Sequence, residues 1–299
     1  MHSASKVLRV GFSRFPRVLS VAMKSTNVSS NVCSETGIGT LMMSRAPVNG
    51  LNYDFLKDFR EELEKLDQDK ACKAVIITSS VKNIFSAGLD IMEMVKPEPK
   101  RLRDFWLSLQ DMWNVLYTYR LPTVALINGH SPAGGCLIAS GCDYRVMLDK
   151  TYTIGLNETK LGIVAPFWSE ASYHFQPASI PRFMDAFVAL VGTRQADLHL
   201  QLGTLFTPQE ALKNGLVDEL ASSEEEAREK SVAAISKFLA VPGFPRYMTK
   251  TSVRSQITAR FVDGRDNDLE TFLNFVQMPA TQKTMIKYVE ALKAKKPKL

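Results

Sequence analysis

The sequence has no run of 18 apolar residues, so it offers no segment that could cross a bilayer as a helix, and we expect no stable insertion into a membrane. Cysteine and histidine are scarce, with four of each among 299 residues. The cysteines do not follow the spacing of a metal site and the histidines do not cluster, so we predict no bound metal ion. Cys136 and Cys142 stand in apolar surroundings, which favours buried thiols over a disulfide framework.

Acidic residues are absent from the first 34 residues, which carry five basic ones: Lys6, Arg9, Arg14, Arg17 and Lys24. Serine is frequent there and apolar residues stand between the charges, a composition typical of a mitochondrial transit peptide. We therefore expect residues 1–34 to be a cleaved leader and the protein to reside in the mitochondrial matrix, with an ordinary disordered tail as the alternative. The last three residues, Pro-Lys-Leu, loosely resemble the peroxisomal address Ser-Lys-Leu, which makes the peroxisome a second candidate location.

The net charge of +6 comes largely from this leader, and the remainder of the chain is close to neutral. That balance argues against a nucleic-acid partner, because proteins that bind nucleic acids carry basic patches. The hydrophobic content of 45% is sufficient for one large domain with a sizeable core. No repeat or low-complexity linker divides the chain.

Apolar runs alternate with amphipathic helical patterns in the first half of the chain, which predicts an α/β fold. The expected order is strand 39–43, helix 52–66, strand 74–78, helix 102–119, strand 124–127 and strand 143–147. From residue 207 onward the pattern is helical. Thr207 and Ser223 have the context of helix caps, and two further amphipathic helices are expected to reach Lys293.

Two glycine-bearing turns each follow a predicted strand and open a predicted helical turn. One contains Gly134 and Gly135 after strand 124–127, and the other is the stretch 85–91. Glycine lets a ligand approach the backbone, and the first N–H groups of a helix lack internal partners. Such a turn can hold a phosphate or a developing oxyanion. A single Gly-Gly turn is more often a matter of tight packing, so the pair carries the functional prediction.

Together these turns resemble the paired oxyanion-hole segments of the crotonase (enoyl-CoA hydratase/isomerase) superfamily. The family patterns F-x-x-G-x-D-[IL] and N-G-x-x-x-G-G occur at residues 85–91 and 128–135. Residues 154–162 resemble the segment that carries the family's carboxylate, and residues 206–218 resemble a late F-x-x-x-E-A…G-L-V-D segment. The resemblance runs from about Gly39 to the C-terminus.

The resemblance implies a ββα spiral core over residues 35–200 and a helical C-terminal region over residues 201–299 that packs subunits into a homotrimer. It implies an acyl-CoA thioester as substrate and no separate cofactor, since CoA is part of the substrate. Trp106, Trp113, Asp143 and Arg145 stand away from the motifs, and we interpret all four as structural.

Site residues follow from the same resemblance. The backbone N–H groups of Leu89 and Gly134 are the expected oxyanion donors, and Glu158 is the expected base. Apolar neighbours (Ile154, Leu156, Leu161 and Ile163) would raise the pKa of Glu158 toward working pH. The expected substrate contacts are Ala87, Gly88, Leu89, Asp90, Ile91, Gly134 and Asn157. A helix-capping role for Asp90 and a turn-forming role for Asn157 are the alternatives.

Leu137 decides between reactions. Hydratases of this superfamily have a second glutamate at this position, which positions and activates water, and leucine can do neither. The resemblance therefore implies an isomerase of fatty acid β-oxidation that moves the double bond of 3-cis- or 3-trans-enoyl-CoA to the 2-trans position. The segments 156–159 and 165–168 also resemble those of the isomerases. The alternatives are an enoyl-CoA hydratase and a catalytically silent assembly or RNA-binding subunit with the crotonase fold.

Overall fold

In the computed structural model of the protein, residues 27–161 and 183–294 are described. Four features of the sequence analysis lie outside them: the first 26 residues of the expected leader, Ile163, the segment 165–168 and the three C-terminal residues. Among the described residues, none of the helices combines the length and the apolar character that a membrane span requires.

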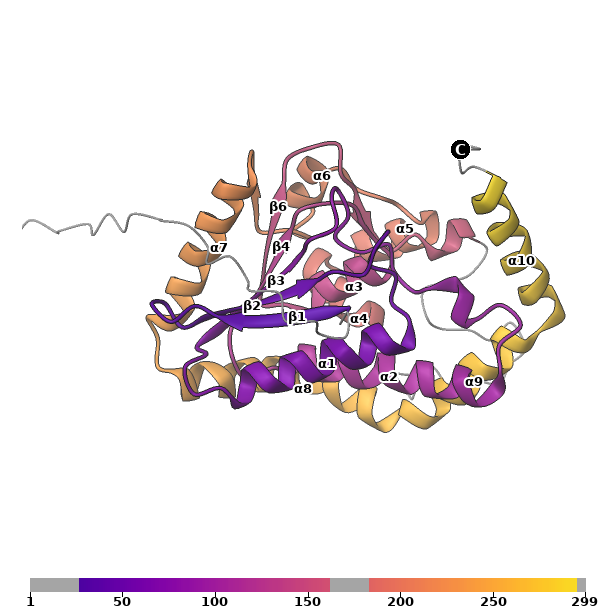
Figure 1. Cartoon of the computed structure of the whole chain (residues 1–299), viewed down its shortest axis with the longest axis horizontal. Coiled ribbons are helices and arrows are strands. Elements are labelled where there is room, and N and C mark those ends of the chain that lie inside the picture. Colours follow the sequence, from indigo (N-terminus) through magenta and orange to yellow (C-terminus); the bar gives the residue numbers. More distant parts are fainter. Residues whose placement is uncertain (1–26, 162–182, 295–299) are drawn as a thin grey trace, which may run out of the picture.

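The centre of the molecule is a mostly parallel sheet, and helical crossovers connect its parallel strands (Figure 1). Within residues 27–161 and 183–294 it has six strands in the order β1 (Val28–Val32), β2 (Ile38–Met43), β3 (Ala74–Ser79), β4 (Thr123–Ile127), β6 (Tyr144–Leu148) and β8 (Glu219–Ala221). β1 runs antiparallel to β2, and the other neighbours are parallel. The expected α/β class is confirmed.

Helices α1 (Tyr53–Gln68) and α2 (Pro99–Tyr117) make the first two crossovers and pack against each other below the sheet (Figure 1). The Asn52 side chain caps α1 by accepting a hydrogen bond from Phe55 N, and one apolar face of α1 is buried. α2 begins three residues before the predicted start, because Glu98 caps it and Pro99 fits its first turn. Trp106 and Trp113 are buried in packing contacts, as expected.

The fold begins before the end of the leader that the sequence analysis expects. β1 lies inside the stretch 1–34 assigned to the leader, yet it pairs with β2 over its whole length. Asn27 precedes it, and its backbone N–H and side-chain amide both donate to the Asp58 carboxylate. The expected helical C-terminal region is confirmed, and it also contributes β8, which forms the far edge of the sheet. β8 pairs with β6, where Arg145 forms an ion pair of 2.7 Å with Asp218.

The remaining helices surround the sheet on several sides (Figure 1). They are α4 (Phe183–Val191), α5 (Thr193–Leu202), α6 (Pro208–Lys213), α7 (Glu224–Leu239), α8 (Gly243–Asp263), α9 (Arg265–Gln277) and α10 (Pro279–Ala294). Thr207 forms the expected capping box and Ser223 caps α7. Three helices follow α7 within the described residues, where two were expected. The added break falls at Gly264, between α8 and α9.

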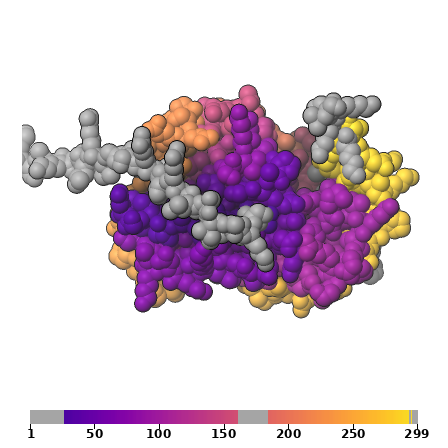
Figure 2. Space-filling view, in the orientation of Figure 1, coloured from indigo at the N-terminus to yellow at the C-terminus, as the bar shows by residue number. Residues whose placement is uncertain are grey.

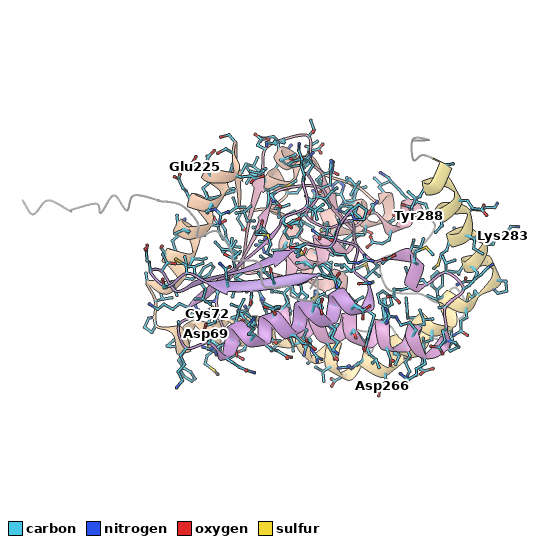
Figure 3. All side chains as sticks on the ribbon, in the orientation of Figure 1. Asp69, Cys72, Glu225, Asp266, Lys283 and Tyr288 are labelled. Atoms are coloured by element: carbon cyan, nitrogen blue, oxygen red, sulfur yellow. The ribbon has the colours of Figure 1, made fainter. Side chains whose placement is uncertain are left out.

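The surface view shows how the chain is distributed over one face. The N-terminal strands and α1 occupy the middle of this face, while α7 and α10 lie toward opposite ends (Figures 1 and 2). Figure 3 places the labelled side chains of Glu225 on α7 and Lys283 on α10 at these ends. Three glutamates in the first turn of α7 complement the positive end of its dipole.

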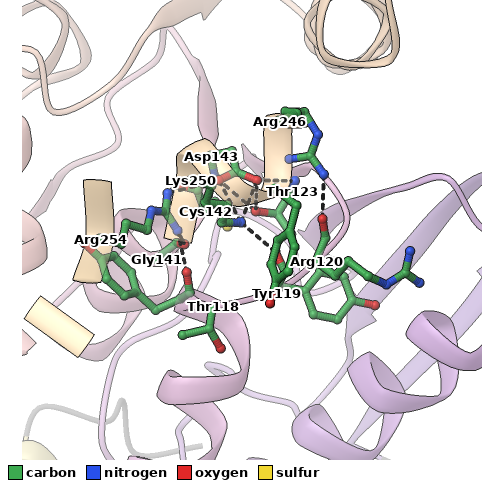
Figure 4. Close-up of polar contacts among 12 residues, drawn as sticks. Thr118, Tyr119, Arg120, Thr123, Gly141, Cys142, Asp143, Arg246, Lys250 and Arg254 are labelled. Carbon is green, nitrogen blue, oxygen red and sulfur yellow. Dashed lines mark hydrogen bonds and ion pairs between the residues drawn. The ribbon is translucent and has the colours of Figure 1, made fainter. Parts of the chain in front are cut away.

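α8 is fixed to the core by a buried cluster around Asp143 (Figure 4). Lys250 Nζ lies 2.8 Å and Arg254 Nη2 3.0 Å from Asp143 Oδ1. Lys250 also donates to Tyr119 O just after α2, and Arg254 donates to Gly141 O at the end of α3 (Gly134–Gly141). Cations there complement the negative ends of the two helix dipoles. Asp143 therefore has the structural role expected of it.

Candidate active site

The two glycine turns lie against each other, backbone to backbone. A Cβ atom built on Gly88 would come within 2.8 Å of Gly134 N, and one built on Gly134 would come within 3.0 Å of Gly88 Cα. Gly88 also has a φ of +89°, a conformation that glycine adopts without strain. The approach therefore requires glycine at both positions, and it brings the N–H groups of Leu89 and Gly134 into one neighbourhood.

Both of these N–H groups are free to bind a ligand. Gly134 is the first residue of α3 (Gly134–Gly141), and no side chain caps this helix. Leu89 lies in an isolated β-bridge with Leu51. The hydrogen bonds of this bridge join Leu51 to Gly88 O and to Asp90 N, so they do not use Leu89 N. Within the described part of the chain, neither N–H has an acceptor. Ala133, just before α3, has the unusual φ of 49°, which is the kind of backbone strain found at functional sites.

A short second sheet connects this turn to the segment that carries Glu158. β5 (Ser131–Pro132) pairs in parallel with β7 (Ile154–Gly155). On either side of the pairing, Ser131 N donates to Thr153 O and Ala133 N donates to Gly155 O, each over 2.8 Å. Glu158 follows three residues after β7 and begins the 3₁₀ helix η2 (Glu158–Leu161). The expected base is thus held to the turn that carries the expected oxyanion donor.

Glu158 is a buried carboxylate with one oxygen that has no partner among the described residues. Its residue is 9% exposed, and within the described residues its buried Oε2 atom has no hydrogen-bond partner. Burial raises the pKa of Glu158 to about 7. Of its expected apolar neighbours, Ile154 and Leu156 are buried. A carboxyl group with this pKa can both take and return a proton near neutral pH.

Cys136 and Leu137 complete the first turn of α3. Burial raises the pKa of Cys136 to about 12, and the charge of Glu158 adds to that rise, which puts the carboxylate within electrostatic reach of this turn. Leu137 is 5% exposed and stands one helical turn after Gly134. Its side chain is apolar, so the first turn of α3 carries no second carboxylate at this position.

The other expected site residues of the turn at 85–91 differ in exposure. Gly88 is buried, Leu89, Asp90 and Ile91 are half-buried, and Ala87 is exposed on the turn. Asp90 caps the 3₁₀ helix η1 (Ile91–Glu93) by accepting from Met92 N, so its alternative reading as a cap is confirmed.

Asn157 stands next to Glu158. Its backbone carbonyl is hydrogen-bonded, whereas its side-chain amide oxygen is not bonded to any described residue. Its backbone carbonyl accepts from Lys160 N. Its side-chain Oδ1 is buried and has no partner among the described residues. A buried amide oxygen without a partner is available to a ligand or a water.

Sequence reasoning missed a network of buried hydrogen bonds that supports the glycine turn at residues 85–91. Asn49 is completely buried, and its Nδ2 donates to Ser79 Oγ and to Phe85 O. Ser86 Oγ donates to Asn49 O and accepts from Gly88 N. The segment 45–50 reads in the sequence as an ordinary loop with proline and glycine, so only the three-dimensional contacts reveal this network.

No group of three or more histidine, cysteine, aspartate or glutamate side chains that could hold a metal ion occurs among residues 27–161 and 183–294. The arrangement instead offers a desolvated base, two free N–H donors and an apolar position at Leu137. This combination suits removal and return of a proton next to a carbonyl whose oxygen collects charge.

Comparison with known proteins gives consistent matches over most of the chain. The model of the family described as enoyl-CoA hydratase/isomerase matches residues 34–296. Enoyl-CoA delta isomerase 1, mitochondrial, from Mus musculus is 42% identical over 261 residues, which cover 87% of this chain and 85% of that protein. The crystal structure of human mitochondrial delta3-delta2-enoyl-CoA isomerase superposes with a TM-score of 0.83 at 38% identity, covering 90% of this chain and 99% of that one. An enoyl-CoA hydratase from Bacillus halodurans has a TM-score of 0.73 at 20% identity and shares the fold.

Proposed function

We propose, from the premise that this chain belongs to the enoyl-CoA hydratase/isomerase family, that it is an enoyl-CoA delta isomerase. Its reaction moves the double bond of 3-cis- or 3-trans-enoyl-CoA to the 2-trans position in fatty acid β-oxidation. The observation that carries this proposal is Glu158, a buried carboxylate with a pKa near 7 that β5 and β7 hold beside two free N–H donors. Relatives of the same name support it over most of the chain.

The proposed reaction needs one base and one oxyanion site. Ionised Glu158 removes a proton from C2 of the substrate, and the electron pair of that C–H bond moves toward the thioester oxygen. The N–H groups of Leu89 and Gly134 stabilise the negative charge that collects on this oxygen. Protonated Glu158 then delivers the proton to C4. As the new C–H bond forms, the C3=C4 double bond becomes C2=C3 and the carbonyl is restored.

The substrate supplies the CoA group, so the proposed reaction has no separate cofactor. In this proposal the turn formed by Ala87, Gly88, Asp90 and Ile91 adjoins the bound thioester, and Asn157 offers its unpaired amide oxygen near Glu158. A pKa near 7 matches the task, because a base must be partly ionised at working pH and still basic enough to take the proton.

Leu137 favours isomerisation over hydration. A hydratase holds a water beside the double bond and moves its proton, and a second carboxylate serves that purpose. A leucine side chain has no acceptor for such a water. The absence of a general acid or base typically costs about 10²–10⁴ in rate. We therefore expect slow hydration of 2-trans-enoyl-CoA by this protein.

A catalytically silent subunit with the same fold is the remaining alternative. Burying a carboxylate costs stability, and a silent protein gains nothing from keeping it. The close approach of Gly88 and Gly134 beside unpaired N–H donors also argues against a catalytically silent subunit.

The experiment that tests the function is direct. The purified protein is incubated with 3-hexenoyl-CoA, and the product is identified by chromatography against 2-trans-hexenoyl-CoA. The proposal expects conversion at an enzymatic rate without added metal or cofactor. If the 3-enoyl thioester is recovered unchanged from folded protein, the isomerase assignment fails.

We propose in addition that the protein works in the mitochondrial matrix. Curated relatives carry the word mitochondrial in their names, and the N-terminal residues have a transit-peptide composition. Since Asn27 and β1 belong to the fold, cleavage should leave Asn27 in the mature protein. N-terminal sequencing of the endogenous protein checks this. An intact Met1, or peroxisomal residence that depends on the last three residues, would contradict it.

We further propose a homotrimer assembled through the C-terminal helical region. Several large apolar side chains of α8 are exposed in the single chain, including Phe244 at 74% and Val253 at 79%. Covering such side chains is favourable in an assembly. Light scattering of the purified protein distinguishes a trimer from a monomer or a hexamer.

A further inference from the structure

The direction of the Leu89 donor is fixed by one residue from another segment. Leu51 N donates to Gly88 O over 2.9 Å, and Leu51 O accepts from Asp90 N over 3.0 Å. The peptide unit is planar and normally trans, so the N–H of Leu89 points away from the carbonyl of Gly88. Holding that carbonyl on Leu51 therefore aims the Leu89 N–H in the opposite direction, toward the site.

Leu51 also contacts the second donor segment. Its side chain is completely buried, and its Cδ1 would lie 2.7 Å from a Cβ atom on Gly134. The backbone of Leu51 thus holds the turn of Leu89 while its side chain packs against the start of α3. The position of Leu51 sets the distance between the two oxyanion donors.

Arg45 holds the segment that contains Leu51. Its Nη1 donates to Gly50 O over 2.8 Å, and its Nη2 forms an ion pair of 2.8 Å with Asp90 Oδ2. Asp90 uses its other carboxylate oxygen to cap η1. One guanidinium therefore joins the residue before Leu51 to the residue after Leu89. The two side chains are 26% and 20% exposed, so solvent screens the pair less than it would on an open surface.

We propose that Arg45 is a positioning residue for the oxyanion hole, acting with Asp90 through Leu51 on the N–H of Leu89. Neither charged side chain touches the reacting atoms in this proposal. The side chain of Asp90 supports the turn, while the backbone of the turn adjoins the bound thioester. The proposal rests on the proposed function, because it assigns the support of that same site.

The test compares Arg45→Met, Arg45→Lys and Asp90→Asn with a matched control, Arg60→Met. Arg60 forms an ion pair of 3.2 Å with Asp111, with side chains 35% and 29% exposed, and it joins α1 to α2 away from the glycine turns. Asp90→Asn keeps an oxygen that can cap η1 but removes the charge that faces Arg45. Circular dichroism verifies that each variant is folded.

Two measurements are made on each variant. The first is kcat and KM for 3-hexenoyl-CoA. The second is the infrared stretching frequency of the ¹³C-labelled thioester carbonyl of bound 2-hexenoyl-CoA, which falls when oxyanion donors polarise the carbonyl. A residue that merely stabilises the fold would leave the frequency in the folded complex unchanged.

Arg45→Met is expected to lower kcat about ten- to hundredfold, as displacements of about 1 Å in a catalytic group do. KM should stay within about threefold, because uniform substrate binding is retained. The carbonyl frequency should move toward its value in water. Asp90→Asn should act in the same direction, Arg45→Lys should keep more activity than Arg45→Met, and Arg60→Met should match the wild type.

Wild-type kcat and carbonyl frequency in folded Arg45→Met would overturn the proposal, as would an equal loss in Arg60→Met. Should Arg45→Met fail to fold, Asp90→Asn and Arg45→Lys decide by the same two measurements. Failure of the proposed function is a separate result. A wild type that binds the thioester without isomerising it would refute the function, while the carbonyl frequency would still report whether Arg45 positions the donors.

Discussion

Replacement of Glu158 by glutamine separates catalysis from stability. Glutamine has nearly the same shape but cannot take a proton, so Glu158→Gln should lower kcat by about 10⁴, the upper end for loss of one acid–base group, because a single carboxylate serves both transfers. The variant should keep its affinity for acyl-CoA and its fold. KM and circular dichroism check these two points.

The same substitution should stabilise the protein at alkaline pH. Burial raises the pKa of Glu158 from an ordinary value of 4.5 to about 7, so folding favours the protonated form. The stabilisation from this protonation is complete below the unfolded pKa and is lost as pH rises through the folded one. At pH 8 the ionised carboxylate should cost the wild type about 3 kcal/mol relative to the glutamine variant, and at pH 5 about 1 kcal/mol.

Two assays test these magnitudes. Absorbance of the conjugated 2-enoyl thioester gives the rate, and thermal unfolding of both proteins at pH 5 and pH 8 gives the stability difference. Glu158→Gln should melt above the wild type, with the larger gap at pH 8. Activity within a few-fold of wild type would mean that another group is the base. Equal melting at pH 8 would mean that Glu158 is not a desolvated carboxylate.

Three further outcomes follow from the site. Because Glu158 must be ionised to take the first proton, kcat/KM should fall about tenfold per pH unit below pH 7, and a profile that is flat down to pH 5 would contradict the pKa of about 7. Gly134→Ala would place a Cβ atom 3.0 Å from Gly88 Cα, so it should separate the two turns and lower kcat about 10²-fold; wild-type kcat in the folded variant would show that the close approach is dispensable. Leu137→Glu should raise crotonyl-CoA hydration while lowering stability, because Leu137 is 5% exposed and a buried charge is costly; a folded variant with unchanged hydration would remove Leu137 as the determinant.

Local signals in the sequence predicted the parts of the fold that depend on neighbouring residues. The uninterrupted run at 74–78 became β3, whose residues are all buried, and Thr207 and Ser223 cap the helices that they were expected to cap. In such elements the spacing of apolar residues and a nearby polar side chain determine the structure almost alone.

Elements that depend on distant partners were not predictable. β1 belongs to a stretch with transit-peptide composition, and it becomes a strand because β2 offers a free edge. Asn49 is buried because Ser79 and Phe85, which are far along the chain, satisfy its amide. Arg45 and Asp90 are 45 residues apart, and nothing local to either indicates their ion pair.

The candidate site shows the same division. Its motifs identified Glu158 and the two glycine turns, since glycine and an isolated carboxylate are visible in the sequence. The β5–β7 pairing that joins them consists of backbone hydrogen bonds between short segments, which leave little sequence pattern. The raised pKa of Glu158 likewise depends on how completely it is buried, which is a property of the fold.

The most direct test of the central claim is the ratio of two rates on one preparation of the wild-type protein: isomerisation of 3-hexenoyl-CoA and hydration of crotonyl-CoA, both at pH 8, where Glu158 with its pKa of about 7 is ionised. Because Glu158 is the single proposed base and Leu137 cannot hold a water, isomerisation should be faster than hydration by about 10² or more. Hydration as fast as isomerisation would contradict the account, because Leu137 would then not exclude the water that a hydratase must activate.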